Sequence, residues 1–467
     1  MLTIYDQFGA GRDVARREFL RVGTAAVGGL SLAHLLTARA LGSSGESLVK
    51  DRSVVVLNLQ GGPTQFELFD PKMEAPREIR SITGEIKTTL SGVTFGGTLP
   101  KLAGLAHKLA VVRSYRHGIS SHGQAARHVM AGGNKTGAMF GALYARVAGL
   151  TDARTAMPRN VLVTSHAMGA EYRELNTVVS RVSQTGTLPP VYKPLDLSTG
   201  AELVDDMKLH VDGRRIEDRR ALLRGVDQLR RRLESVENLS AAGHFQEKAF
   251  DVLLRGVSRA FDISDEPASL LERYDTGRFV PTEAAKRRNS YAAQFSPVAL
   301  GRQLLLARRL CEAGCGFVTV TQTGWDMHGG GNELTMKDGV AQLTPAFDKA
   351  VSAFIEDVAA RGLEDRILLV ITGEFGRTPR INRAGGRDHW GSLCPIVFVG
   401  GGLNMGQVVG KSDRSGARPA SRPITSEDVR ATILHTLLDI PEVRVQSGLP
   451  PDVFEAVTEG RPIPELV

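Results

Sequence analysis

The chain has 467 residues, of which 42% are hydrophobic, 23% charged and 6% aromatic, and this composition excludes a disordered, collagen-like or coiled-coil protein. Three cysteines are too few for a disulfide framework. The formal net charge of +7 comes from 58 basic and 51 acidic residues, so the surface is mixed. Composition therefore indicates a globular protein, and its reaction has to be inferred from individual residues.

The first forty residues have the features of a twin-arginine export signal. Arg16 and Arg17 precede a weakly apolar stretch, residues 22–36, and the small-residue sequence at 38–40 follows it. The stretch is shorter than the roughly 20 apolar residues that a membrane span needs. We expect residues 1–40 to direct the protein to the periplasm or out of the cell. An uncleaved anchor or an amphipathic helix is the alternative, and we expect no membrane span in the mature chain.

The mature chain alternates short apolar runs with helical patterns. Nearly continuous apolar runs, typical of strands covered on both faces, predict strands over residues 54–59, 109–114, 160–164, 317–321, 367–372 and 396–399. Helices are predicted over 122–131, 297–313, 344–361 and 426–438, the last with Ser426 as its N-cap. This alternation predicts an α/β fold, with a doubly wound, mostly parallel sheet and helices on both faces.

One segment, residues 201–275, contains no strand pattern. Its arginine run between 214 and 232 is interleaved with acids that can pair on a helix surface. A helical insertion is therefore favoured over a nucleic-acid surface, because aromatic interleaving and zinc-finger spacing are absent. We predict a single α/β domain over residues 41–467 with a helical insertion at about 201–275, and no nucleic-acid partner.

Polar residues follow the predicted strands directly. Ligand sites of parallel α/β sheets lie beyond the carboxyl ends of the strands, so these positions predict a site at that edge. The candidates are Gln60, Glu67 and Asp70 after the first strand, His117, Ser120, Ser121, His122 and His128 after the second, Asp326 and His328 after the fourth, and Glu374, Arg377, Asp388 and His389 after the fifth.

Asp326 and His328 are candidate metal ligands. In an extended segment, side chains two residues apart point to the same face. Carboxylate oxygen and imidazole nitrogen both suit Zn²⁺, and His389 would supply a third ligand. Glu374 is a candidate fourth ligand or a bridge to a second ion. We expect one divalent metal, Zn²⁺ or else Ca²⁺, Mg²⁺ or Mn²⁺; the alternative is an aspartate that caps a turn beside a surface histidine.

Three further residues are catalytic candidates. His122 begins a predicted helix, where the dipole favours a neutral base or metal ligand, although a loop histidine bonded to backbone is the alternative. Ser121 is a possible nucleophile, although the sequence has no G-x-S-x-G motif. Arg377 could bind a sulfate, phosphate or carboxylate through its guanidinium, or could pair with Glu374 or Asp388.

These motifs stand in one order along the chain that resembles an exported bacterial family, domain of unknown function 1501. The residues that carry the resemblance are 59–63, 69–72, 121–123, 131–133, 325–328, 373–379, 387–390 and 431–435. The family is considered a distant relative of alkaline phosphatases and sulfatases. The resemblance therefore implies an alkaline-phosphatase-like fold for essentially the whole mature chain.

The resemblance also implies an incomplete version of the two-metal site in those enzymes. Gln60 stands where they have an acidic ligand, Ser120 and Ser121 lie near the nucleophile position, and Glu374-Phe375 replaces an Asp-His pair. Their C-x-P-x-R sequence is absent. One metal, held by Asp326, His328 and His389, is implied.

We therefore expect an exported, metal-assisted hydrolase of sulfate or phosphate esters with a degenerate metal site. The alternative is a non-catalytic binding or partner protein that retains the fold. The expected partner is an anionic small molecule or a sulfated or phosphorylated polymer, with a protein partner as a further possibility.

Overall fold

The computed structural model describes residues 48–169, 172, 176–197, 257–281, 283, 286, 297–330 and 333–467. The predicted export signal and most of the predicted helical insertion lie outside these residues. Among the helices that the described residues form, none combines the length and the apolar character needed to cross a membrane.

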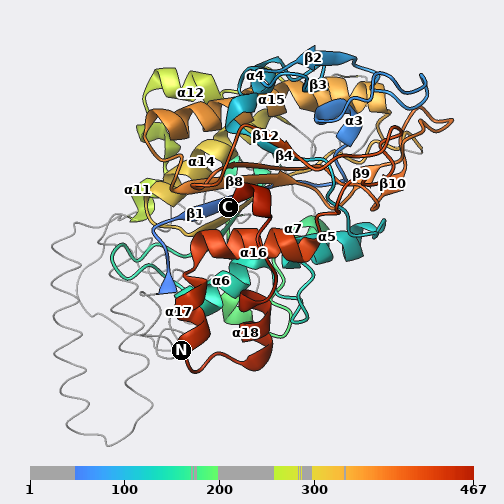
Figure 1. The fold of residues 1–467 in the computed structure, drawn as a ribbon. Coiled ribbons are helices and arrows are strands. Elements are labelled where there is room, and N and C mark those ends of the chain that lie inside the picture. Colours follow the sequence, from blue (N-terminus) through green and yellow to red (C-terminus); the bar gives the residue numbers. More distant parts are fainter. Residues whose placement is uncertain are drawn as a thin grey trace, which may run out of the picture.

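A central sheet of eight strands organises the described part of the chain (Figure 1). Its strands are β1 (Ser53–Leu59), β4 (Ala110–Val112), β5 (Asn160–Val163), β6 (Leu195–Asp196), β7 (Phe317–Gln322), β8 (Ile367–Thr372), β11 (Ile396–Gly400) and β12 (Gln407–Val409). They lie in the order β12-β4-β11-β8-β1-β7-β5-β6. Both pairings of β11 are antiparallel and the other pairings are parallel, so the sheet is mostly parallel as predicted.

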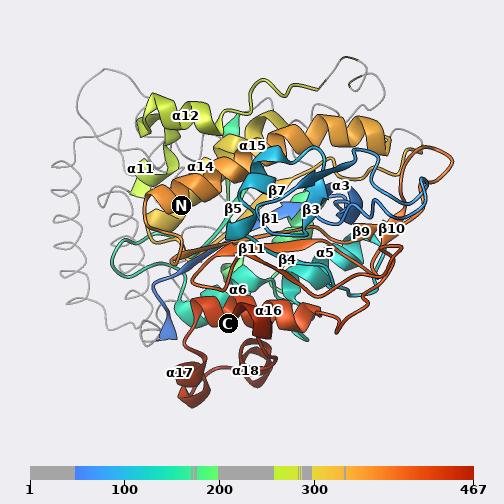
Figure 2. The same cartoon turned by 45° about the horizontal axis from the view of Figure 1, so that its top comes forward.

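Helices cover both faces of this sheet (Figures 1 and 2). One layer contains α4 (Pro100–Gly104), α11 (Val257–Phe261), α12 (Ala268–Tyr274), α14 (Leu300–Glu312) and α15 (Met336–Ala360). The other contains α5 (His122–Ala131), α6 (Phe140–Ala148), α7 (Asn176–Val182), α16 (Ser426–Leu437), α17 (Ile440–Val445) and α18 (Pro451–Thr458). The α/β fold with helices on both faces is therefore confirmed.

Strand β1 shows why the apolar runs form this sheet. All seven of its residues are buried, and alternate side chains enter two different cores. Val55 and Leu57 pack with residues of α14 and α15, whereas Val54 and Val56 pack with residues of α6 and α16. Each buried Val or Leu stabilises the fold by about 1.5–3 kcal/mol, so the two-sided pattern fixes the register of the strand.

Two expectations about individual elements are corrected. Helix α15 begins at Met336, where the Thr335 hydroxyl accepts the N–H of Asp338, and Pro345 lies inside the helix rather than near its start. Helix α16 is capped by Thr425 rather than Ser426, because Thr425 and Asp428 form a reciprocal capping box. Strand β11 runs against its neighbours, a direction that the apolar pattern alone does not encode.

Two small sheets lie outside the central one: β2 (Glu85–Lys87) pairs with β3 (Thr94–Gly96), and β9 (Gly376–Arg377) pairs with β10 (His389–Trp390). The second of these lies beside α5 and the short helix α3 (Gln65–Leu68), at the right of Figure 1. Cys311, Cys315 and Cys394 are free, buried thiols.

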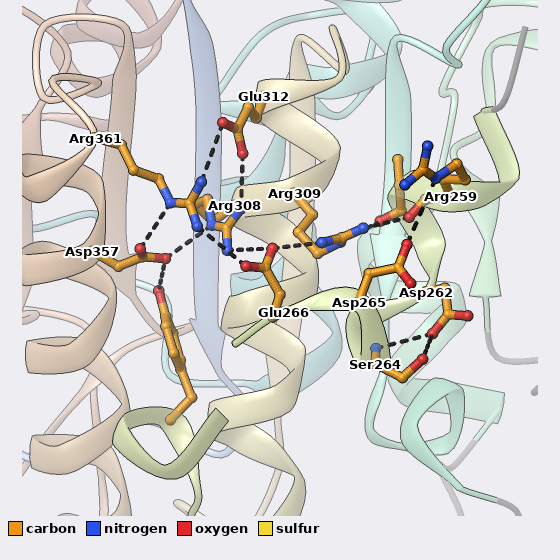
Figure 3. Close-up of polar contacts among 12 residues, drawn as sticks. Arg259, Asp262, Ser264, Asp265, Glu266, Arg308, Arg309, Glu312, Asp357 and Arg361 are labelled. Atoms are coloured by element: carbon orange, nitrogen blue, oxygen red, sulfur yellow. Dashed lines mark hydrogen bonds and ion pairs between the residues drawn. The ribbon is translucent and has the colours of Figure 1, made fainter. Parts of the chain in front are cut away.

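A buried ion-pair network joins α14, α15 and the segment just before α12 (Figure 3). Arg308 is 1% exposed and contacts Glu266 at 2.7 Å, Glu312 at 2.8 Å and Asp357 at 2.9 Å. Arg361 contacts the other oxygen of Asp357 at 2.9 Å. Since each carboxylate has a partner, the charges are compensated inside the helical layer.

Candidate metal centre

Asp326 lies at the centre of a histidine cluster at the carboxyl edge of the sheet. Its Oδ2 lies 3.0 Å from Nε2 of His122 and 3.5 Å from Nε2 of His328. Its Oδ1 lies 3.1 Å from Nε2 of His389. One ligand atom each from His122, Asp326 and His389 fall within 4.8 Å of one another. The histidines and Asp326 therefore converge although they come from three separate segments.

The strands explain this convergence. His122 begins α5, which follows β4; Asp326 and His328 follow β7; and His389 lies on β10, in the connection between β8 and β11. Strands β4, β7 and β8 run in the same direction, so their carboxyl ends meet at one edge of the sheet. The cluster therefore lies at the carboxyl edge of the sheet, where the ligand sites of parallel sheets are found.

The outward nitrogens of two of the rings are held by hydrogen-bond acceptors. Nδ1 of His122 lies 2.7 Å from Glu374 Oε1, and Nδ1 of His389 lies 3.1 Å from the carbonyl oxygen of Ser120. A carbonyl or carboxylate oxygen accepts only, so each Nδ1 carries the hydrogen and donates it. The arrangement fixes both rings with Nε2 toward Asp326.

Glu374 is a fully buried carboxylate beneath this cluster. Besides His122, it accepts hydrogen bonds from Gln60 Nε2 at 2.6 Å and from the Gly61 N–H at 2.9 Å. Its two oxygens thus face three donors from within the protein. Glu374, the predicted fourth ligand or bridge to a second ion, contacts Nδ1 of His122, whose Nε2 faces Asp326.

Gly61 is required for the close packing of the loops. Its φ is +118°, and a Cβ at this position would lie 2.3 Å from the backbone nitrogen of Asp326. Only glycine adopts this backbone at such an approach. Phe375 stacks on His389, with ring centroids 4.4 Å apart and planes inclined by 28°. The two contacts hold the Asp326 and His389 segments in place.

Arg377 is buried completely beside Asp326. Its Nη2 donates to Asp326 Oδ1 at 2.7 Å and to the carbonyl of Trp325 at 3.0 Å, and its Nε donates to the carbonyl of Gly62 at 2.8 Å. Its guanidinium also contacts the carbonyls of Gly61 and Arg387. These bonds tie the loops after β1, β7 and β8 together, and the carboxylate that Arg377 engages is that of Asp326.

The electrostatics of the cluster favour ionised groups. Burial lowers the pKa of His122, but hydrogen bonds to Asp326 and Glu374 outweigh it and raise the pKa to about 9. Burial acts to raise the pKa of Asp326, and hydrogen bonds from His122 and His389 and the charge of Arg377 hold it well below its usual range. The cluster therefore attracts positive charge to the space around Asp326.

Glu333 is a nearby carboxyl that the sequence analysis did not single out. Burial raises its pKa, and the negative charge of Asp326 raises it further. It follows His328 by five residues in the same glycine-rich loop. The sequence signal for Glu333 was an acidic residue in a loop that directly follows a predicted strand.

The remaining candidates lie in different surroundings. Ser121 is exposed as the residue before α5, and its hydroxyl caps no N–H of that helix. The His117 and His128 rings lie 5.6 Å apart, and burial together with His128 lowers the pKa of His117 to about 4. The carbonyl of Ser120 accepts from Nδ1 of His389, and its hydroxyl accepts the N–H of Gly391 at 2.9 Å.

The fold and the cluster define an α/β protein with a carboxylate and imidazole site at the carboxyl edge of a mostly parallel sheet. The chain belongs to the family described as Protein of unknown function (DUF1501), which it matches over residues 51–466. The resemblance noted in the motifs is thereby confirmed. Among curated proteins, none matches the chain at a significant level.

Solved structures with related folds include two hydrolases. The PsFucS1 sulfatase from Pseudoalteromonas sp. is 12% identical, with a TM-score of 0.34, 90% of this chain and 71% of that chain covered. The phosphonate monoester hydrolase SpPMH from Silicibacter pomeroyi is 11% identical, with a TM-score of 0.37, 88% of this chain and 75% of that chain covered. These likenesses are too loose to assign an activity, so the proposal below rests on the site itself.

Proposed function

We propose that this protein is a metal-dependent hydrolase of phosphate or sulfate esters. His122, Asp326 and His389 bind one divalent cation, and His328 lies close enough to complete the ligand set. The single observation that carries the proposal is the orientation of the two rings, since Nδ1 of His122 and Nδ1 of His389 both donate away from Asp326.

This orientation has an electrostatic consequence. A neutral imidazole that carries its hydrogen on Nδ1 has a lone pair on Nε2. At 3.0 and 3.1 Å, these lone pairs face carboxylate oxygens of Asp326, which also carry only lone pairs. Positive charge must lie between them, either as protons on the rings or as a metal ion. A metal-ligating histidine commonly donates its other N–H to a carboxylate or a backbone carbonyl, and Glu374 and Ser120 supply these two acceptors here.

The donor set favours Zn²⁺ or Mn²⁺ over Ca²⁺. Imidazole nitrogens with one carboxylate are typical ligands of Zn²⁺ and of other transition metals, whereas Ca²⁺ takes oxygen ligands. When bound, such an ion polarises an ester oxygen and lowers the pKa of a bound water.

The protein residues around the ion have separate roles in this proposal. Glu374 orients His122, and Arg377 fixes the Asp326 carboxylate through its 2.7 Å contact. Ser121 remains our candidate nucleophile because its hydroxyl is exposed beside His122. Anionic esters, including sulfated or phosphorylated polymers, are the proposed substrates.

The proposal is tested by metal analysis and ester hydrolysis on the same preparations. Purified protein is loaded with Zn²⁺ or Mn²⁺ and assayed with p-nitrophenyl phosphate and p-nitrophenyl sulfate. His389→Ala is compared with His128→Ala, which removes a histidine outside the cluster. We expect about one metal per chain and hydrolysis in the wild type and in His128→Ala, and loss of both in His389→Ala.

Two outcomes would contradict the proposal in different ways. Protein without stoichiometric metal would exclude the metal centre. Stoichiometric metal without hydrolysis of either ester would support a non-catalytic metal-binding protein that retains the fold.

We also propose that the protein acts outside the cytoplasm. The support is the sequence of residues 1–40, in which Arg16 and Arg17 precede a short apolar stretch. Replacing both arginines by lysine keeps the charge. If the segment is a twin-arginine signal, this change retains the protein in the cytoplasm, as cell fractionation would detect; unchanged export would exclude that route.

A further inference from the structure

A second cavity lies at the opposite end of the sheet from the metal centre. Its volume is about 590 Å³, within the usual range for small-molecule sites. Ser53 at the start of β1 and Ile367 at the start of β8 both line it, whereas Gln60 and Glu374 follow the other ends of the same strands. The seven residues of β1 separate the two sites by roughly 20 Å.

The charged lining of this cavity is mainly basic. The cations are Lys50, Arg52, Arg154, Arg159 and Arg366, and the acids are Asp51, Asp152 and Glu312. Glu312 is already engaged by Arg308 and Arg361 of the buried network. Its charge is therefore partly neutralised from outside the cavity.

The other two acids leave two cations without a carboxylate partner. Asp51 pairs with Arg366 at 2.9 Å, and Asp152 pairs with Arg159 at 3.4 Å and with Arg154 at 3.9 Å. Lys50 donates to the carbonyl of His435, and Arg52 has no ion pair within the described part of the chain. Burial lowers the pKa of Lys50, the charge of Arg52 lowers it further, and the charge of Asp439 acts in the opposite direction. The two cations therefore repel each other at the cavity wall.

Two buried side chains provide a preformed polar wall. Arg159 is 5% exposed, and its Nη1 donates to the Tyr144 hydroxyl at 3.2 Å. Tyr144 is fully buried, so its hydroxyl orients the Arg159 guanidinium from behind the cavity wall. A Cβ at Gly316 would lie 2.2 Å from that hydroxyl, so glycine at this position admits the tyrosine.

From this geometry we propose that the cavity is a binding site for a small, multiply charged organic phosphate. Lys50 and Arg52 supply positive charge that no ion pair within the described residues engages, and Arg159, oriented by Tyr144, supplies further hydrogen-bond donors. Charge-assisted hydrogen bonds to phosphate oxygens are the strongest contacts that these groups can form. The bound anion places negative charge beside both Lys50 and Arg52 and thereby offsets the repulsion between them. This site is independent of the metal centre and of the proposed hydrolase activity.

The test measures binding of inorganic pyrophosphate by calorimetry in the presence of EDTA, which removes metal from the first site. We expect saturable binding with about one pyrophosphate per chain, and a rise in the unfolding temperature with ligand concentration. Arg52→Met should weaken binding about fivefold or more, which corresponds to the loss of roughly 1 kcal/mol. Tyr144→Phe should also weaken binding, because Arg159 loses the hydroxyl that orients its guanidinium.

Two control variants locate the binding. Arg77→Met removes an exposed arginine outside the cavity, and His389→Ala alters the metal centre; both should bind pyrophosphate as the wild type does. Absence of saturable binding in the wild type would overturn the proposal. An equal loss in Arg52→Met and Arg77→Met would also overturn it, because the binding would then follow net charge. Loss in His389→Ala would place the pyrophosphate at the first site instead.

Discussion

Glu374 Oε1 lies 2.7 Å from Nδ1 of His122, although the two residues are 252 positions apart in the sequence. The glutamate is fully buried, and it also holds the loop after β1 through Gln60 and Gly61. One carboxylate therefore orients a candidate metal ligand and connects it to the central strand.

Glu374→Gln should weaken metal binding without removing a ligand. The amide cannot accept from three donors as the carboxylate does, so His122 loses its fixed orientation. Loss of such an outer partner typically lowers metal affinity by 10–100-fold, and we expect a change in that range by competition with a chromogenic chelator. Glu78→Gln, at an exposed position, is the matched control. Unchanged affinity in Glu374→Gln would exclude the positioning role.

His389→Ala should have a larger effect on metal affinity than Glu374→Gln. It removes a nitrogen that lies 3.1 Å from Asp326 Oδ1, and we expect a loss beyond about 100-fold, above the range for outer partners. The same chelator titration measures it, and His128→Ala should match the wild type. If His128→Ala lost the metal and His389→Ala kept it, the ligand set would be wrong.

The stability of the metal-free protein should fall as pH rises above neutrality. His122 has a pKa of about 9 in the fold, above its ordinary value near 6.5. The stabilisation from its protonated ring is fully present below about pH 6.5 and is lost as the pH rises to about 9. Urea unfolding in EDTA between these pH values measures the loss. His122→Gln should flatten the pH dependence, and an equally steep dependence in that variant would assign the effect to another group.

Metal binding should release protons for the same reason. A cation and a proton compete for Nε2 of His122, so binding at pH 7.5 should release roughly one proton per chain. Calorimetric titrations in buffers of different ionisation enthalpy measure this number. Proton release that stayed the same in His122→Gln would argue against His122 as a ligand.

Arg308→Met should destabilise the fold strongly. It leaves Asp357 and Glu266 with one partner fewer inside the helical layer, and the loss of one partner from a buried ion pair costs about 3–5 kcal/mol. Arg273→Met breaks the exposed pair with Glu356, where we expect about 0–1 kcal/mol. Denaturant unfolding of both variants measures the difference. Equal effects would show that the network contributes no more than a surface pair.

Several features of the fold could be predicted because their causes are local. Continuous apolar runs mark the buried strands, and β1 and β8 were predicted to within one residue. The helix at 122–131 was also predicted within its observed bounds. The helix predicted over 344–361 was placed too late, because the Thr335 cap begins it eight residues earlier, at Met336.

The amino-acid sequence by itself determined which residues stand at the ends of the strands, and hence that Asp326, His328, Glu374 and His389 belong to one edge of the sheet. It also determined the family. Only the tertiary structure decided what each of these residues faces. Arg377 and Glu374 carry charges that suit a ligand site, yet both are buried against loops whose carbonyls and N–H groups need partners. The physical reason is that strand ends are fixed by local apolar patterns, whereas the contacts of a charged side chain depend on how distant loops pack.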